Sequence, residues 1–232
     1  MKRTNLRDPE LYTFVMEVLN SDFPVFIIEF PNVYGLMAAN SIKGVNAMNK
    51  VKSRLPNKYY STFLGDSSSF RKLMHPELAQ IYDCINDTIN GAFFRFPLKE
   101  KTKRSNYVDF NGCHQFLIED GALRAFVTKI ERLQLAECST SDFFSTNYQA
   151  PIISSLNKSG SKAGVITSEK EAVEFGIKNF VPLFIENDYG KNKGSSYPIF
   201  SVNISGKFLL ERDGPSASHI SYSLQRLNEE LI

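Results

Sequence analysis

The sequence has no tryptophan, three cysteines, three histidines and almost no net charge. The cysteines, Cys84, Cys113 and Cys138, are scattered and form no C-x-x-C pair, so neither a disulfide framework nor a zinc knuckle is favoured. No histidine has a second histidine four residues away, so we expect no metal site built from them. Lysine and arginine total 27 against 25 acidic residues, a net charge of +2 that argues against general affinity for nucleic acid.

Long apolar runs are also missing. No stretch approaches the ~20 apolar residues of a membrane span, and the mostly polar segment after Met1-Lys2-Arg3 lacks the apolar core of a signal peptide. The chain contains no Walker loop, no G-x-G-x-x-G, no H-E-x-x-H and no G-x-S-x-G elbow. Together with the dispersed cysteines, these absences lead us to expect a cytoplasmic protein with reduced thiols and no membrane contact.

Aromatic residues are abundant, with 19 phenylalanines and 10 tyrosines among the 232 residues. Apolar residues make up 42% and charged residues 22%, an ordinary composition for a globular protein with ample surface to bury. Strand and helix candidates alternate without a regular βαβ period and without an internal repeat. The sequence therefore predicts an α/β fold of mixed, α+β type, with a twisted mixed sheet flanked by helices. We expect a single domain over residues 1–232.

The spacing of apolar residues and the turn signals predict the elements of this fold. Helices are expected over residues 8–20, 41–53, 67–74, 76–89, 120–133, 169–177 and 216–231. Strands are expected over residues 25–30, 59–64, 93–97, 107–118, 151–156, 181–186, 199–202 and 208–211. Asp8-Pro9 is typical of a helix start, and Ser168 with Glu171 is typical of a capping box.

Three cations lie at the end of a predicted helix and in the loop after it, within Lys52-Ser53-Arg54-Leu55-Pro56-Asn57-Lys58. The simpler interpretation is that cations at a helix C-terminus complement its dipole and stay in water. The alternative is an anion clamp, because arginine offers a planar fork for carboxylate or phosphate oxygens and lysine offers a point charge.

Two further segments carry polar groups at the ends of predicted strands. In the segment 151–160, an apolar strand leads directly into Ser154, Ser155 and Asn157 and then a glycine turn. Such groups can converge on a ligand, although an ordinary serine and asparagine turn has the same composition. In the segment 30–36, a strand end is followed by a turn that contains Tyr34. Each feature is weak alone, and their order along the chain gives them weight.

In this order the three segments resemble the YrdC-like family of threonylcarbamoyl-AMP synthases. That family has P-T-(D/E)-T-x-Y-G-L after a strand, then K-x-R-P-x-x-K after a helix, then (T/S)-S-A-N-x-S-G after an apolar strand, and finally P-S-T-(I/V)-(I/V)-D and R-(E/P)-G. The matching residues are Pro31, Tyr34-Gly35-Leu36, Lys52, Arg54, Lys58, Ser154, Ser155, Asn157, Ser159, Gly160, Pro198, Val202, Asn203 and Arg212-Asp213-Gly214. Order and spacing agree over about residues 20–220, with the helices near 8–20 and 216–231 outside this core.

The chain also departs from the family pattern. The Thr/acidic/Thr element is replaced by Asn32-Val33, and proline stands one place late at Pro56. The Ser-Thr pair of the fourth motif becomes Ile199-Phe200, and Gln115 falls where the family has an arginine. These changes remove polar groups that could hold a triphosphate.

The resemblance implies an enzyme of the nucleotidyltransferase class. It would join L-threonine, bicarbonate and ATP, the last with Mg²⁺, into threonylcarbamoyl-adenylate for the t6A modification of tRNA. It implies a concave basic cavity in which Lys52, Arg54, Ser155 and Asn157 are catalytic. The implied binding residues for nucleotide and substrate are Tyr34, Lys58, Ser154 and Arg212. No resident metal site is implied.

The eroded motifs keep a second hypothesis open. The chain would then be a non-catalytic or altered-substrate YrdC-like paralogue that binds a nucleotide, tRNA or double-stranded RNA. Two basic loops, Lys99 to Arg104 and Lys191 to Lys193, could contact RNA. Neither has the interleaved aromatic residues of a stacking platform, so solvated loops explain them more simply.

Overall fold

The computed structural model of the chain describes residues 1–54, 58–99, 105–137, 141–144, 146–157, 164–187 and 194–231. The chain packs as two compact units, the first formed by residues 1–60 and 151–196 and the second by residues 61–150 and 197–232. Each unit contains strands from distant parts of the sequence, because the chain leaves the first unit after Tyr60 and returns to it at Pro151. The expectation of a single domain stays a prediction.

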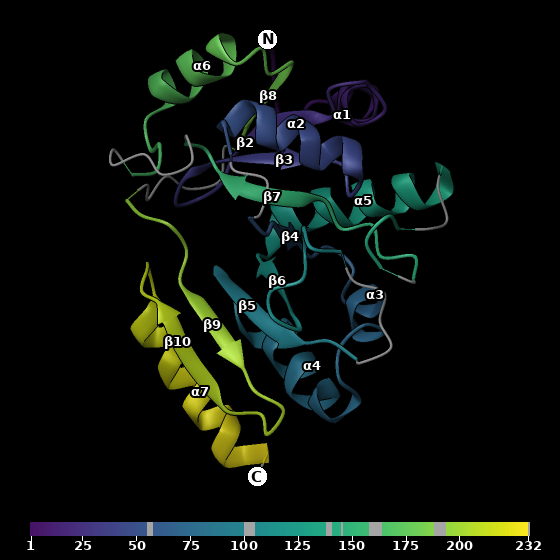
Figure 1. Cartoon of the computed structure of the whole chain (residues 1–232). Helices are drawn as coiled ribbons and strands as arrows, with labels where there is room; N and C mark the ends of the chain where they lie inside the picture. Colours follow the sequence, from purple (N-terminus) through teal and green to yellow (C-terminus); the bar gives the residue numbers. More distant parts are fainter. Residues whose placement is uncertain are drawn as a thin grey trace. The chain divides into compact units, whose positions relative to one another are not determined.

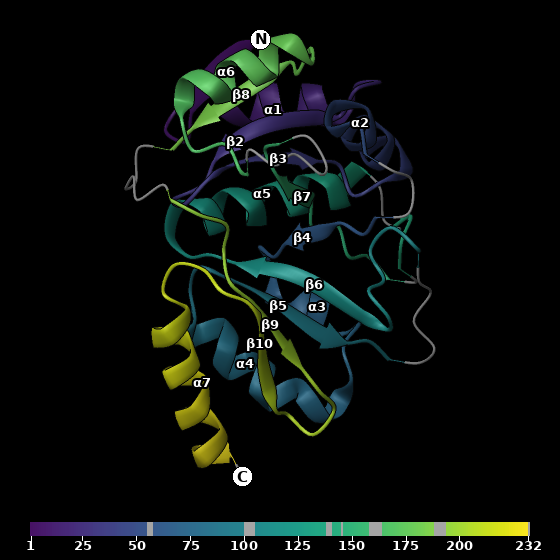
Figure 2. The ribbon, with the colours of Figure 1, turned by 60° about the vertical axis from the view of Figure 1, so that its left-hand side comes forward.

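The first unit is a mixed sheet with helices packed on it (Figure 1). Its strands lie in the order β1-β8-β2-β3-β7. The strands are β1 (Lys2–Asn5), β2 (Val25–Glu29), β3 (Tyr34–Ala38), β7 (Ile152–Ser155) and β8 (Leu183–Glu186), and the helices are α1 (Leu11–Leu19), α2 (Ile42–Lys52) and α6 (Glu169–Lys178). β8 pairs in parallel with β1 and β2, and the other two pairs are antiparallel. α1 packs on β2 and β8 (Figure 2).

The second unit has the strand order β4-β6-β5-β9-β10. Its strands are β4 (Ser61–Phe63), β5 (Ala92–Pro97), β6 (Cys113–Ile118), β9 (Ile199–Val202) and β10 (Phe208–Arg212). Its helices are α3 (Ser67–Arg71), the short 3-10 helix η1 (Pro76–Leu78), α4 (Ala79–Thr88), α5 (Gly121–Glu137) and α7 (Ala217–Leu231), the last packed on α4 and β10. β4–β6 and β5–β9 are parallel, whereas β5–β6 and β9–β10 are antiparallel. The prediction of a mixed sheet flanked by helices is therefore confirmed.

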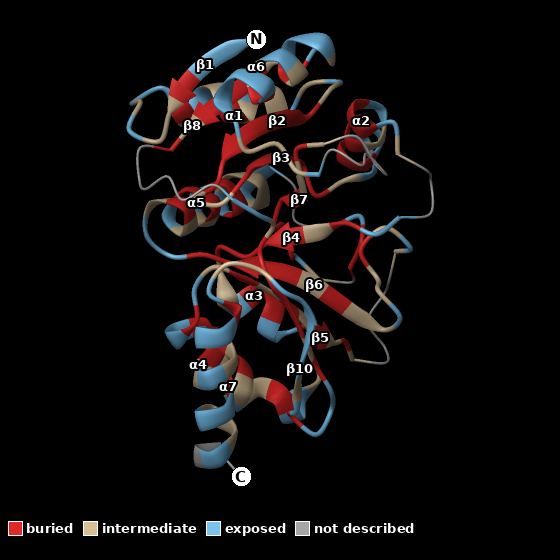
Figure 3. Ribbon diagram, turned by 90° about the vertical axis from the view of Figure 1, so that its left-hand side faces the viewer, coloured by how far each residue is buried: buried red, intermediate tan, exposed pale blue. Residues whose placement is uncertain are grey.

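The strands differ in how far they are buried. Every residue of β2 and β3 is buried, whereas β10 is exposed along most of its length (Figure 3). The core of the second unit is aromatic, with Phe70 of α3 and Tyr82 of α4 packed against Phe116 of β6. The aromatic residues counted in the sequence thus supply much of the apolar surface that each sheet buries.

A neutral hydrogen-bond chain runs through the aromatic core of the second unit. Nδ1 of His114 lies 2.9 Å from the carbonyl of Val108, which fixes Nδ1 as the donor and leaves Nε2 to accept from the Thr62 hydroxyl at 2.8 Å. Thr62 in turn accepts from the Tyr148 hydroxyl at 2.6 Å. Burial lowers the pKa of His114 to about 4, so the ring stays neutral near pH 7.

Several details differ from the sequence-based expectations. The strand expected over residues 107–118 forms only from Cys113 onward, as β6. β1 was not expected, because its residues are polar and it forms by pairing with β8 rather than by burying an apolar face. The sequence predicted that Tyr34 lies in a turn, whereas β3 begins at this residue. The tight turn comes directly before it, and in it the Phe30 amide donates to the Val33 carbonyl at 2.9 Å. Ser168 precedes α6 but its side chain makes no capping hydrogen bond, so the predicted capping box is wrong.

Among the described residues, none of the helices has the length and the apolar character that crossing a membrane requires.

Candidate functional site

The end of α2 places the two cations of the second motif. Ser41 caps the start of this helix, and Ser53 ends it in the left-handed conformation with φ of 48°. The backbone amide of Arg54 then donates a hydrogen bond back to the carbonyl of Asn49 at 3.0 Å. This sharp ending leaves Lys52 inside the first unit and directs the chain away immediately after it.

The polar turn of the third motif follows β7. Ser155 pairs with Gly35 and Ser154 with Leu36, so the two serines point to opposite faces of the sheet. The chain then turns, and the amide of Asn157 bonds the carbonyl of Ser155 at 3.1 Å. The Ser155 hydroxyl donates to Oδ1 of Asn157 at 2.9 Å, which fixes the amide side chain.

Lys52 joins these two segments, which lie about a hundred positions apart in the sequence. Its Nζ donates to the carbonyl of Ser155, to the carbonyl of Asn157 at 2.8 Å and to Oδ1 of Asn157 at 3.0 Å. Only 3% of Lys52 is exposed. The interpretation of this lysine as a solvated helix-end cation is therefore wrong. The three hydrogen bonds use all three donors of the ammonium group.

The electrostatics of Lys52 are those of a buried cation beside a second cation. Burial, and to a lesser degree the charge of Arg54, lower the pKa of Lys52 to about 7. Burial also lowers the pKa of Arg54. A buried lysine whose pKa is lowered further by a neighbouring arginine is typical of a site that receives an anion.

Arg54 is held by the segment that follows it. Its guanidinium donates to the carbonyl of Tyr59 at 2.7 Å and lies over the Tyr60 ring, 4.3 Å from the ring centre. Its Nε is buried and has no hydrogen-bond partner among the described residues. A buried donor without an acceptor is costly, and an oxyanion would satisfy it.

Tyr60 completes this cluster and Asn49 supports it, and neither was identified from the sequence. The Tyr60 hydroxyl donates to Oδ1 of Asn49 at 2.7 Å and holds its ring against Arg54. No motif singled out Tyr60, and it lies directly before β4, where strand periodicity does not fix which way its side chain points. We refer to Lys52, Arg54, Tyr60, Ser155 and Asn157 as the Lys52 cluster.

The other predicted residues of the first unit lie elsewhere. Tyr34 is buried in β3, with its hydroxyl 3.3 Å from Oε1 of Glu29, and burial raises its pKa. Ser154 points to the face opposite Ser155. Lys58 is exposed, and no hydrogen bond or ion pair of the described residues joins it to the Lys52 cluster.

Arg212 and Gln115 belong to the second unit. Arg212 lies at the end of β10 and donates from Nε and Nη2 to the carbonyl of Tyr197, at 3.0 and 2.6 Å. Gln115 lies on β6 and accepts from Nε of Arg95 at 2.7 Å. Residues 55–57, 100–104, 158–163 and 188–193 lie outside the described residues, and with them Pro56, Ser159, Gly160 and the cations of the two basic loops except Lys99.

The fourth motif is apolar in the structure as well as in the sequence. Phe200 is 1% exposed and its ring stacks on Phe94, with 5.7 Å between the ring centres. Ile199 is also buried. These two positions therefore contribute packing to the second unit and offer no side-chain hydrogen bond to a ligand.

Comparison with solved structures gives several likenesses of fold. A double variant of Sua5 from P. abyssi matches with a TM-score of 0.66 at 16% identity, over 95% of this chain and 63% of Sua5. A hypothetical protein from Streptococcus mutans matches with a TM-score of 0.68 at 18% identity, over 97% and 95% of the two chains. The P. abyssi Sua5 complex with L-threonine matches with a TM-score of 0.61 at 14% identity, over 87% of this chain and 54% of that one.

No family model and no curated protein sequence matches this chain. The chain spans less than two thirds of the length of Sua5, so Sua5 contains a large part that has no counterpart here. The likeness covers nearly all of this chain, including both units. The resemblance to the YrdC-like family that the motifs carry therefore extends to the three-dimensional structure, and the chain has the fold of Sua5.

Proposed function

We propose that the chain is a threonylcarbamoyl-adenylate synthase, which joins L-threonine, bicarbonate and ATP and releases pyrophosphate. The observation that carries the proposal is the Lys52 cluster, in which two cations and a serine and asparagine turn meet on the fold of Sua5. The solved complex of Sua5 with L-threonine supports threonine as the amino-acid substrate. The product would serve the modification of tRNA.

The proposed reaction needs charge neutralisation more than acid–base chemistry. Carboxylation of the threonine amine gives a carbamate, whose oxygen attacks the α-phosphorus of ATP as pyrophosphate leaves. Every reactant is anionic or carries a carboxylate, so bringing them together in water costs electrostatic repulsion. Arg54 is suited to this task, because none of the described residues offers its buried Nε an acceptor and its guanidinium is held against the Tyr60 ring.

Lys52 would contribute in a different way. Its three donors bond oxygens of the turn, so it holds the Ser155 and Asn157 groups in place and adds positive charge behind them. An arriving carbamate or phosphate would meet the Asn157 amide and the Arg54 guanidinium first. ATP would enter with Mg²⁺ as part of the substrate, in keeping with the oxygen preference of that ion.

The proposal is tested by measuring pyrophosphate release from the purified chain with ATP, L-threonine and bicarbonate. We expect release that depends on all three substrates, and incorporation of labelled bicarbonate into an adenylate. Arg54→Met should lower the rate by roughly 100-fold or more, as expected for loss of a group that neutralises transition-state charge. Release without threonine, or no release from a folded protein, would contradict the proposal.

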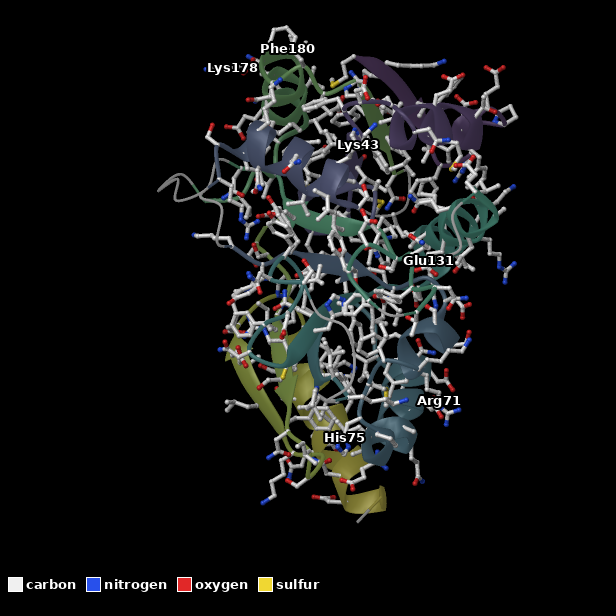
Figure 4. The ribbon with its side chains drawn as sticks, turned by 45° about the vertical axis from the view of Figure 1, so that its right-hand side comes forward. Lys43, Arg71, His75, Glu131, Lys178 and Phe180 are labelled. Atoms are coloured by element: carbon white, nitrogen blue, oxygen red, sulfur yellow. The ribbon has the colours of Figure 1, made fainter. Side chains whose placement is uncertain are left out.

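Lys43→Met is a matched control for substitutions in the Lys52 cluster. Lys43 lies on the same helix and pairs with Asp22 on the surface, with 66% of its side chain exposed (Figure 4). The same loss of one positive charge at this position should leave the rate within about twofold, because surface ion pairs contribute little. An equal loss of rate in Lys43→Met and Arg54→Met would point to a general charge effect.

A second candidate is a protein that binds nucleotide or RNA without this reaction. The burial of Ile199 and Phe200 favours it, because two polar positions of the family are used for packing here. It predicts binding of ATP or AMP in calorimetry together with no pyrophosphate release. Titration with a short RNA duplex separates the RNA-binding form from the nucleotide-binding form.

A further inference from the structure

The edge strand of the second unit, β10, carries apolar side chains into solvent. Among the described residues, β9 is the one strand that pairs with it. Leu209 is 64% exposed and Leu210 is 41% exposed (Figure 3). Edge strands usually carry charged residues or are covered, because their outer backbone groups pair readily with another strand. The edge strand of the first unit follows this rule, since Lys2–Asn5 is polar throughout, whereas β10 departs from it.

The hydrogen bonds of the β9–β10 hairpin show which backbone groups of β10 face inward. The amide of Asn203 donates to the carbonyl of Lys207 at 3.1 Å, next to the turn. Bonded and non-bonded residue pairs alternate along an antiparallel ladder. Leu209, which lies opposite Ser201, therefore belongs to the next bonded pair and directs its amide and carbonyl toward β9.

The other side of β9 gives the same alternation. The amide of Phe93 in β5 donates to the carbonyl of Pro198 at 3.0 Å. Because backbone groups alternate along a strand, Ser201, three residues on, directs its own groups to the opposite side, toward β10. On β10, the residues that flank the partner of Ser201 are Phe208 and Leu210. Their amide and carbonyl groups therefore point to the outer edge of the sheet.

These outward groups restrict how two copies of β10 can pair around a two-fold axis. An axis at Leu209 places Phe208 of each copy opposite Leu210 of the other, so that the outward groups of both residues are bonded. An axis at Leu210 would use Arg212, which lies beyond the bulge that interrupts the ladder. An axis at Phe208 would set Leu210 opposite Gly206 in the hairpin turn. The register centred on Leu209 is therefore the one that uses the regular part of the strand.

The side chains match in this same register. Leu209 of one copy meets Leu209 of the other in a non-bonded pair, where facing side chains come closest. Lys207 of each copy comes opposite Glu211 of the other. Glu211 already pairs with Arg95 of its own chain, so each new contact extends an existing ion pair. The strand is thus complementary to itself in charge and in apolar surface.

We infer that β10 is an interaction surface for a second copy of this chain, which pairs with it edge to edge and antiparallel around a two-fold axis at Leu209. An isologous contact of this kind closes on itself and gives a dimer. Two short strands bury a small area, so we expect a dissociation constant on the order of tens of micromolar. The inference goes beyond the proposed function and does not depend on it.

The test is sedimentation velocity of the whole chain from about 1 to 500 µM, a range that spans the expected dissociation constant. We expect a reversible monomer–dimer equilibrium. Leu209→Lys places two lysines opposite each other at the axis and should weaken association by at least roughly tenfold. A chain that stays monomeric at the highest concentration overturns the inference, and so does a Leu209→Lys variant that associates as tightly as the unaltered chain.

Ile204→Lys is the matched control. Ile204 lies in the turn of the same hairpin and is 55% exposed, but it falls outside the paired segment 207–211. The same substitution at this position should leave the dissociation constant within about twofold. An equal loss of association in Ile204→Lys and Leu209→Lys would show a general effect of added charge and overturn the inference.

Amide hydrogen exchange of the unaltered chain tests the register without any substitution. The amides of Phe208 and Leu210 should exchange more slowly at about 500 µM than at about 5 µM, because most chains are dimeric only at the higher concentration. The amide of Leu209 should be protected at both concentrations, since its partner is Ser201 of its own chain. Exchange at Phe208 and Leu210 that does not change with concentration would place any dimer contact elsewhere and overturn the inference.

Discussion

Each unit contains a buried ionisable side chain on a helix that holds the turn after a strand. In the first unit, Lys52 near the end of α2 donates to the carbonyl oxygens of Ser155 and Asn157. In the second, Glu131 of α5 accepts from the amides of Gly65 and Asp66, at 2.9 and 2.7 Å (Figure 4). The two arrangements are alike in geometry, but Lys52 donates hydrogen bonds to its turn and Glu131 accepts them from its turn.

The surroundings of the two charges differ. The backbone at Gly65 touches α5 so closely that an added Cβ would lie 2.5 Å from the amide nitrogen of Thr128, and Asp66 goes on to cap α3. Glu131 therefore closes a packed junction. Lys52 is followed by Arg54, whose buried Nε has no acceptor within the part of the chain that the structure describes. A buried ionisable group supports structure where the polar groups around it all have hydrogen-bond partners. It indicates a ligand site where a neighbouring group with the same sign of charge lacks such a partner.

The largest expected effect is on activity, from Lys52→Met. We expect the rate of pyrophosphate release to fall by roughly 100-fold or more, because the Ser155 and Asn157 turn loses its anchor and the site loses a charge. Stability should change by less than about 1 kcal/mol, since the lost hydrogen bonds and the relieved burial of charge oppose each other. Urea denaturation and initial rates measure the two quantities, and a large loss of stability with normal activity would make Lys52 a structural residue like Glu131.

Glu131→Ala should show the reverse pattern, with a large effect on stability. The substitution leaves the amides of Gly65 and Asp66 buried without acceptors and opens a cavity, at a cost of about 3 kcal/mol in the free energy of unfolding. Urea denaturation measures this cost. Glu137→Ala, at the end of the same helix, is the control and should change stability by less than about 0.5 kcal/mol.

The sequence predicted most of the elements because their apolar periods are clear. The helix over 120–133 and the strand over 93–97 lie within or close to α5 and β5. β1 escaped prediction because its Lys-Arg-Thr-Asn sequence has no apolar alternation, and only pairing with β8 makes it a strand. The division into two units also escaped, because it depends on which distant strands pair.

The candidate site was predictable where the family motifs carried it. Lys52, Ser155 and Asn157 meet as the order of the motifs implied, although the charge run alone favoured a solvated helix end. The place of Arg95 beside Gln115 was not predictable, because it depends on the register of β5 against β6. Register is set by tertiary packing, and a local pattern does not contain it.

The contributions of Glu131 and Lys52 to stability should depend on pH with opposite signs. The pKa of Glu131 is raised by burial to about 8, so between about pH 4.5 and 8 the folded state binds the extra proton and stability falls as pH rises. The pKa of Lys52 is lowered to about 7, so above pH 7 the unfolded state binds the extra proton and stability rises with pH.

Each slope is measured as the difference between the unaltered chain and one variant. Against Glu131→Gln, the chain should lose stability from pH 5 to 8, by up to about 1.4 kcal/mol per pH unit. Against Lys52→Met, it should gain stability from pH 7.5 to 10. Slopes of the same sign in both comparisons would show that the two buried charges are not counterparts.

The smallest expected effect concerns how the helix that carries Lys52 ends. Ser53 is exposed and holds a left-handed conformation that costs a residue with a Cβ about 1 kcal/mol, whereas glycine adopts it freely. Ser53→Gly should raise stability by about 0.5 kcal/mol, because the relieved strain exceeds the greater freedom of glycine in the unfolded chain. Ser53→Ala is the control and should be neutral, and Ser53→Val should destabilise, because a branched Cβ fits this conformation worst. Thermal unfolding ranks the four proteins, and a Ser53→Gly variant less stable than Ser53→Ala would show that the serine hydroxyl, rather than the backbone, holds this end of α2.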